Sequence, residues 1–151
     1  MDYNELILNG GTLVKSKIDG DFEGFNDNKL FPLNNGQYWI QKNYKYWYYY
    51  SYMASVTIYR YHNINFLTID GQNQFVEVEL LANVIKATIV NDFYGWSGDT
   101  LFELDNGQIW KQCEYNYDYN YLYRPNAIIY SIGYGFKIFV KGKSVGVTRI
   151  K

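Results

Sequence analysis

Tyrosine occupies every second position in two stretches of the chain, YKYWYYYSY at residues 44–52 and YNYDYNYLY at residues 115–123. An aromatic ring with a hydroxyl at its tip can pack on an apolar partner and also form a hydrogen bond, so tyrosine serves both cores and binding surfaces. In an extended strand, the period of two places all five tyrosines of a stretch on one face. We call these two stretches the tyrosine ladders.

The residues between the ladder tyrosines differ between the two ladders. Trp47 and Tyr49 of the first ladder stand where the second has Asp118 and Asn120. A face kept in both copies is typical of a structural role, so we expect the tyrosines to cover the core, with their hydroxyls at its rim. Large aromatic residues that replace Asp and Asn are expected to be exposed and to form an interface. Trp47 and Tyr49 are therefore candidate partner-binding residues.

Residues that could carry catalysis or bind a metal are scarce. The chain has one histidine, His62, and one cysteine, Cys113. This leaves too few soft ligands for a zinc site and excludes an intrachain disulfide. No nucleophile can be matched with a base and an orienting group. We predict a protein without enzymatic activity, metal or cofactor.

Charge and hydropathy exclude further classes. Lys and Arg number 14 against 15 Asp and Glu, a net charge of -1, which provides no long-range field to attract a polyanion. Nucleic acid is therefore an unlikely partner on this criterion. No segment approaches the roughly 20 apolar residues of a membrane span, and residues 1–12 lack the pattern of a signal peptide. We expect a cytoplasmic protein that does not bind membranes.

The ladders belong to a unit that occurs twice, since residues 18–59 align without a gap onto residues 89–130. The repeats extend over residues 13–81 and 84–151, after an N-terminal segment at residues 1–12. A two-residue linker is too short for independent tumbling, so we expect a fixed, packed pair. The residues expected to hold each repeat together are identical in both copies: Trp39 and Trp110, Gln41 and Gln112, and Gly36 and Gly107.

The local signals within a repeat all favour β-structure, and no window shows sustained helical periodicity. Asn35-Gly36, repeated as Asn106-Gly107, predicts a two-residue hairpin turn in which both residues have positive φ. The strands predicted for the first repeat are residues 13–18, 30–33, 37–41, 56–61, 65–69 and 75–80. So many short strands in one repeat favour closure into a small barrel, SH3-like by its strand lengths, with an OB-like barrel as the alternative.

The pattern I-x-x-x-F-x-G-[FW]-x(4)-[LF]-F-x-L-x-N-G-Q-x-W-x-Q, followed by Y-x-Y-x-Y-x-Y, resembles small uncharacterised bacterial proteins built from tandem SH3-like repeats. The resemblance covers nearly the whole chain after the first dozen residues. It implies a fold and a bacterial origin, and no activity. SH3-like barrels commonly present ligand-contacting aromatics in the first loop, which follows the first strand of the repeat. Phe25 and Trp96 each follow a glycine in this loop. A plug over the end of the barrel is the alternative role for these two residues.

These observations predict a non-enzymatic interaction protein that recognises a protein or peptide through Trp47, Tyr49, Phe25 and Trp96. Aromatic grooves suit extended proline-rich peptides, because such ligands are already ordered. Packing of the same surface in a homo-oligomer remains open. The alternative function is binding of single-stranded nucleic acid, with tyrosines stacked on bases.

Overall fold

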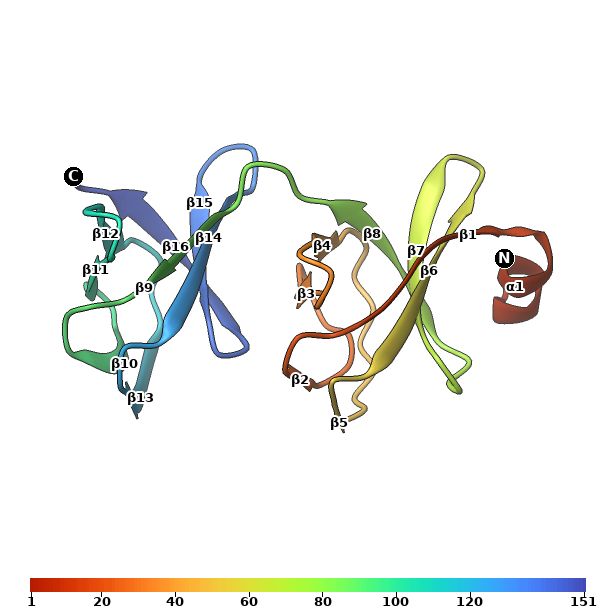
Figure 1. Cartoon of the computed structure of the whole chain (residues 1–151), viewed down its shortest axis with the longest axis horizontal. Coiled ribbons are helices and arrows are strands. Elements are labelled where there is room, and N and C mark those ends of the chain that lie inside the picture. Colours follow the sequence, from red (N-terminus) through yellow and green to blue (C-terminus); the bar gives the residue numbers. More distant parts are fainter. The chain divides into compact units, whose positions relative to one another are not determined.

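Short antiparallel strands make up most of the computed structural model, which describes residues 1–151. The chain divides into two compact units, Met1–Ala82 and Asn83–Lys151, which we call unit 1 and unit 2. The expectation of an all-β protein is confirmed, apart from one short helix near the N-terminus (Figure 1).

Six strands of unit 1 form one antiparallel sheet in the order β1-β6-β7-β8-β4-β3, and β2 and β5 form a separate pair. The strands are β1 (Gly11–Lys17), β2 (Asp21–Phe22), β3 (Leu30–Pro32), β4 (Tyr38–Gln41), β5 (Ser51–Tyr52), β6 (Ser55–Tyr61), β7 (Ile64–Ile69) and β8 (Phe75–Leu80). Alternating inward residues of this sheet provide the core, including Ile58 and Leu67, which have no exposed surface.

The two ends of this sheet meet at a bridge between Ile18, just after β1, and Leu33, just after β3. Next to the bridge, the Asp19 N–H donates to the Pro32 carbonyl at 2.8 Å. The first and last strands are therefore joined, which gives the sheet a barrel-like closure and protects edges that would otherwise expose unpaired backbone groups.

Unit 2 has the same topology. Its sheet has the order β11-β12-β16-β15-β14-β9, closed by a bridge between Ile89 and Leu104, and β10 and β13 form the separate pair. The strands are β9 (Ile85–Thr88), β10 (Phe93–Ser97), β11 (Leu101–Glu103), β12 (Ile109–Gln112), β13 (Tyr117–Leu122), β14 (Asn126–Ser131), β15 (Phe136–Val140) and β16 (Lys143–Arg149).

Trp39 and Trp110 occupy equivalent places in the two cores, each with 2% of its surface exposed. The indole N–H of each donates to the side-chain oxygen two residues earlier, Gln37 at 3.2 Å and Gln108 at 3.0 Å. Both tryptophans thus bury a large ring while their one polar atom stays hydrogen-bonded.

The Asn-Gly hairpins differ from the predicted turn. Only the glycines have positive φ, at +87° for Gly36 and +86° for Gly107. The Gly36 N–H donates to the Leu33 carbonyl and the Leu33 N–H to the Gln37 carbonyl. These bonds define a three-residue loop in which only the last residue must be left-handed. The expectation that both turn residues have positive φ is wrong, whereas the hairpin itself is present.

The helix α1 (Tyr3–Asn9) was not predicted. Asp2 caps it, since an Asp2 carboxylate oxygen accepts the Glu5 N–H at 2.8 Å, and the side chain of Leu6 is fully buried. A seven-residue helix offers too few turns for a detectable hydrophobic period. No helix in the chain is both long and apolar enough to cross a membrane.

Candidate functional site: the tyrosine ladders

The ladder tyrosines point away from the cores in both units. All ten are exposed, from 50% of the residue surface at Tyr121 to 87% at Tyr115. The expectation that they cover the core is therefore wrong. Ten exposed phenol rings in two rows form the most conspicuous surface feature of the chain, and we treat them as the candidate functional site.

In unit 1, the ladder segment is anchored through Trp47. Its backbone pairs with that of Phe25: the Phe25 N–H donates to the Trp47 carbonyl at 2.8 Å and the Trp47 N–H to the Phe25 carbonyl at 3.2 Å. The Trp47 ring lies 5.1 Å from that of Phe25, and Tyr49 stacks on Trp47 at 5.2 Å with nearly parallel planes. Trp47 and Tyr49 are thus half-buried against the core, and the expectation that they are exposed is wrong.

Lys45 lies on the same inward face of the first ladder. Its amino group donates to the Phe75 carbonyl at 2.7 Å and lies 4.6 Å from the centre of the Phe75 ring. Partial burial lowers the pKa of this amino group. The inward face of the ladder therefore packs over the core, and this leaves the tyrosine face to solvent.

In unit 2, the same place is filled differently. Trp96, the counterpart of Phe25, is 4% exposed and packs on Phe93 and Phe102, with ring centres 5.6 Å away in each case. The larger indole fills the space that Phe25 and Trp47 share in unit 1. Asp118, the counterpart of Trp47, is exposed and pairs with Lys143 at 3.2 Å. The larger loop residue of unit 2, Trp96 in place of Phe25, is therefore accompanied by a smaller ladder residue, Asp118 in place of Trp47.

Phe25 and Trp96 were candidates for ligand contact in the first loop. With 2% and 4% of their surfaces exposed, both belong to the buried cores of their units. Of the two roles expected for them, the plug agrees with their burial. The candidate binding surface consequently moves from Trp47, Tyr49, Phe25 and Trp96 to the outward rings of the ladders.

Two glycines let the ladders approach the first loop. Gly24 has φ +93°, and a Cβ there would lie 1.9 Å from the Trp47 carbonyl oxygen. Gly95 has φ +101°, and its Cβ would lie 2.1 Å from the Asp118 carbonyl oxygen. No side chain can occupy either position without displacing ladder backbone. Gly24 and Gly95, which are equivalent in the two repeats, therefore allow the ladder backbone to pack closely against the loop of the same unit.

Gln41 and Gln112 hold the start of each ladder. Gln41 is fully buried, and its amide group donates to the carbonyls of Asn26 at 2.6 Å and Asn43 at 2.8 Å. Its side-chain oxygen accepts the Asn26 N–H at 3.1 Å. Gln112 donates to two carbonyls as well, those of Glu114 and Asn116, but its side-chain oxygen has no partner. Both glutamines satisfy backbone groups where the chain turns from the sheet into the ladder.

The outward faces of the two ladders have different neighbours. Tyr94 of β10 adds a ring to the second ladder, 5.4 Å from Tyr121 and 6.5 Å from Tyr119. In the first ladder, the Tyr50 hydroxyl donates to an Asp21 carboxylate oxygen at 2.8 Å. This hydrogen bond raises the pKa of Tyr50. The second ladder therefore has an additional aromatic neighbour, and the first has a carboxylate bound to one of its hydroxyls.

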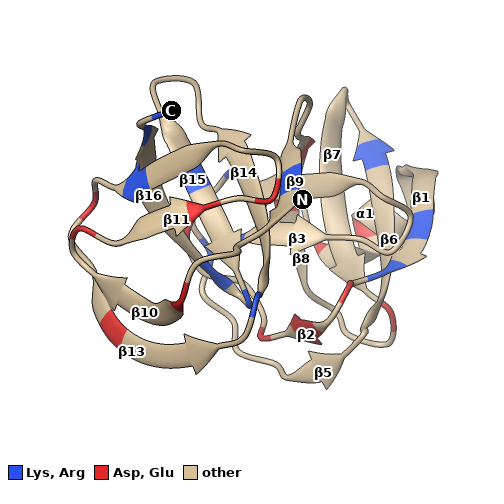
Figure 2. Cartoon of the chain, turned by 60° about the vertical axis from the view of Figure 1, so that its left-hand side comes forward, with Lys and Arg blue, Asp and Glu red and all other residues tan.

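Charged residues flank the ladders without forming a basic surface. Figure 2 shows the acidic positions on β2 and β13, which are Asp21 and Asp118. Arg124 lies at the end of the second ladder, its guanidinium carbon 5.9 Å from the centre of the Tyr123 ring. A row of cations that could track a phosphate backbone is not present along either ladder.

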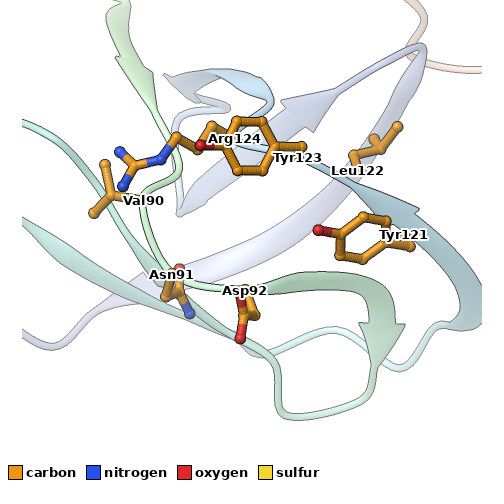
Figure 3. Close-up of a pocket in the computed structure, with 7 residues that line it drawn as sticks. All are labelled: Val90, Asn91, Asp92, Tyr121, Leu122, Tyr123 and Arg124. Carbon is orange, nitrogen blue, oxygen red and sulfur yellow. The ribbon is translucent and has the colours of Figure 1, made fainter.

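A pocket of about 120 Å³ lies in unit 2 where the end of β13 meets the chain preceding β10 (Figure 3). Its lining residues are Val90, Asn91, Asp92, Tyr121, Leu122, Tyr123 and Arg124. Asn91 is occupied with backbone groups, since it donates to the Leu101 carbonyl and accepts the Glu103 N–H. The pocket therefore extends the second ladder by one carboxylate, on Asp92, and one guanidinium, on Arg124.

The two residues singled out for their reactivity lie outside the ladders' tyrosine faces. His62 is exposed in the turn between β6 and β7, where its ring contacts that of Tyr61 at 4.1 Å. Cys113 is a free, exposed thiol just after β12. No group of three or more His, Cys, Asp and Glu residues is placed to hold a metal ion.

Neither a protein-family model, nor a curated protein, nor a solved structure matches this chain.

Proposed function

We propose that the chain is a non-enzymatic binding protein that recognises an extended peptide segment of a partner protein through the outward rings of the tyrosine ladders. One observation carries this proposal: all ten ladder tyrosines are at least half exposed, in two rows supported by folded units. Tyrosine provides a large, amphipathic contact area at a low cost in conformational entropy, which is why it is enriched in binding surfaces.

The geometry favours an extended ligand. Alternate residues of a strand are about 7 Å apart, so a peptide in a polyproline or extended conformation can place successive side chains between successive rings. The phenol hydroxyls add hydrogen-bonding groups at the tips of the rings, and the only one tied to a neighbouring carboxylate is that of Tyr50. A surface of this kind combines apolar contact with polar specificity.

As part of this proposal, each unit is an SH3-like barrel and the two form a packed tandem pair. The closed six-stranded order supports a small barrel, although an OB-like barrel is the alternative assignment. The bacterial origin and cytoplasmic location remain predictions from the sequence.

Binding of single-stranded nucleic acid is the second candidate, because exposed rings such as Tyr94 and Tyr119 could stack on bases. The carboxylates of Asp21 and Asp118 beside the ladders oppose a phosphate backbone. We therefore place the peptide first.

Selection from a phage-displayed random-peptide library on the immobilised full chain tests the proposal. Peptides recovered on the wild type are expected to lose at least about tenfold in affinity when Tyr117 and Tyr121, or Tyr46 and Tyr48, are replaced by Ser. The matched control is Tyr134→Ser, which removes a still more exposed tyrosine outside the ladders. Peptides that bind all these variants equally well would place the binding site elsewhere, and a salt-dependent affinity for oligothymidylate lost in the same variants would favour nucleic acid.

A further inference from the structure

The outer edge of β13 has no partner within the chain. β10 and β13 form a two-stranded sheet of their own, so each strand is hydrogen-bonded on one side only (Figure 2). β10 uses its other side within its own loop, where the Ser97 N–H donates to the Thr100 hydroxyl and that hydroxyl donates to the Gly95 carbonyl. β13 has no such cover, and an open strand edge is a template for pairing with another chain.

The register identifies which backbone groups are free. The Asp118 carbonyl and the Asn120 N–H lie closest to Gly95 of β10, so these two residues direct their backbone groups toward β10. Successive residues of a strand direct their N–H and C=O groups to opposite sides. The backbone groups of Tyr117 and Tyr119 therefore point outward, up to the point beyond Asn120 where the pairing of β13 with β10 shifts register.

We propose that this edge pairs with the same edge of a second copy of the chain, antiparallel and centred on Tyr119. In this register Tyr119 faces Tyr119 of the second copy, and Tyr117 faces Tyr121. Tyr119 directs its backbone groups outward, so the central pair can exchange two hydrogen bonds. The result is a closed twofold dimer with a four-stranded ribbon, which has no remaining β13 edge.

The sequence of β13 is self-complementary in this register. Read from Tyr119 in either direction, the neighbours are Asp118 and Asn120, then Tyr117 and Tyr121. Asp118 therefore faces Asn120 of the second copy, and an amide can donate to a carboxylate across the pair. A shift by one residue pair would place Asp118 opposite Asp118 or Asn120 opposite Asn120. Charge repulsion disfavours the register with Asp118 opposite Asp118, and the register centred on Tyr119 is the one that provides two amide–carboxylate pairs.

Unit 1 cannot offer the same edge, because its regular ladder strand is limited to the two residues Ser51–Tyr52 of β5. Its ladder segment is held at Trp47 and Lys45, whose backbone N–H groups donate to Phe25 and Asn26. In unit 2, where Asp118 replaces the tryptophan, the ladder contains a strand of six residues with both faces largely exposed, and its pairing with β10 shifts register once. This inference goes beyond the proposed function, because it uses the edge of β13 and leaves the tyrosine faces open.

Sedimentation velocity of the full chain over a range of concentrations tests the proposal. We expect a reversible monomer–dimer equilibrium in the wild type. Asn120→Asp should weaken the dimer roughly two- to thirty-fold, because two Asp–Asp pairs then face each other, and Asn120→Lys should strengthen it by a similar factor. Asn116→Asp is the matched control, since position 116 faces Leu122 of the second copy, and it should change the equilibrium little.

Two further measurements address the backbone pairing. Tyr119→Pro removes an outward N–H without touching the pairing to β10, so it should yield a monomer with an unchanged circular dichroism spectrum. Amide exchange of Tyr119 should slow as protein concentration rises, whereas that of Asn120 should not change. A wild type that stays monomeric at millimolar concentration, or forms assemblies larger than a dimer, would overturn the proposal. So would equal effects of Asp and Lys at position 120.

Discussion

Phe25 and Trp47 are joined by two backbone hydrogen bonds of 2.8 and 3.2 Å, while their rings lie 5.1 Å apart. This double attachment fixes the middle of the first ladder to the first loop. In unit 2, Trp96 fills the corresponding core position by itself, and Asp118 contacts solvent and Lys143. The two units therefore support their ladders by different means, and this difference can be measured.

Trp47→Ala should lower the free energy of unfolding of unit 1 by about 2 kcal/mol, because it removes a half-buried indole from Phe22, Phe25 and Tyr49. Urea unfolding followed by far-ultraviolet circular dichroism measures the change. The control is Asp118→Ala at the equivalent position, which removes an exposed ion pair and should cost about 0.5 kcal/mol or less. Equal losses in the two variants would contradict the different roles of these residues.

Gly24→Ala and Gly95→Ala should each destabilise their unit by more than about 2 kcal/mol, because the new methyl group meets the carbonyl oxygen of Trp47 or Asp118. Gly71→Ala is the matched control: its φ is also positive, at +83°, but nothing lies within 4 Å of the new Cβ. It should cost only the conformational penalty of about 1 kcal/mol. Thermal unfolding measures the loss of stability in each variant. If Gly71→Ala were as destabilising as Gly24→Ala and Gly95→Ala, the loss would come from the positive φ alone and not from contact with the ladder.

Gln41→Leu should be more destabilising than Gln112→Leu. The first leaves the Asn26 N–H and the carbonyls of Asn26 and Asn43 without their partner, at a cost of about 2–4 kcal/mol in the free energy of unfolding. The second also removes a buried oxygen that has no partner, so its net cost should be about 1–2 kcal/mol. Chemical denaturation of the two variants measures both losses in the free energy of unfolding. A larger loss for Gln112→Leu than for Gln41→Leu would contradict the prediction.

Tyr130 should make the chain less stable at alkaline pH. Burial is the main cause that raises the pKa of its phenol above 10.0, and the folded state therefore keeps a proton that the unfolded chain releases. The free energy of unfolding should be unaffected below about pH 10 and should fall as the pH rises beyond it. Tyr130→Phe should flatten this decline, whereas Tyr134→Phe, at an exposed tyrosine, should not. Urea unfolding at several alkaline pH values measures both slopes.

The sequence contained enough information to predict the strands of the six-stranded sheets, because the strand patterns and the Asn-Gly turn occur twice. The strands of the separate pairs β2–β5 and β10–β13 were not predicted. β3, β4, β6, β7 and β8 lie within a few residues of the predicted ranges. The helix α1 was missed although Asp2 and Glu5 stand at the spacing of a capping box, a signal independent of periodicity. The exact hairpin geometry was missed because Asn-Gly fits both a two-residue and a three-residue loop.

The orientation of the ladders was predicted incorrectly for a physical reason. A period of two shows that the tyrosines share a face, but it does not show which face meets the core. The missing signal was a pair of linked differences: Phe25 with Trp47 in one copy, and Trp96 with Asp118 in the other. The larger residue in the loop of unit 2 accompanies a smaller one in its ladder, so positions 47 and 118 pack against the loop in unit 1 and need not do so in unit 2. These linked differences mark the inward face of the first ladder.

Each ladder lies in the connection between two strands of its six-stranded sheet. These strands are β4 and β6 in unit 1, where the connection is residues 42–54, and β12 and β14 in unit 2. β6, β7 and β8 pair with neighbours in sequence, whereas β4 pairs with β8 only across this connection. Contacts between neighbouring segments form faster than those that must close a long loop. We therefore expect the hairpins to fold first and the tyrosines to take their final positions late, so that the surface for a partner exists only in molecules that have completed folding.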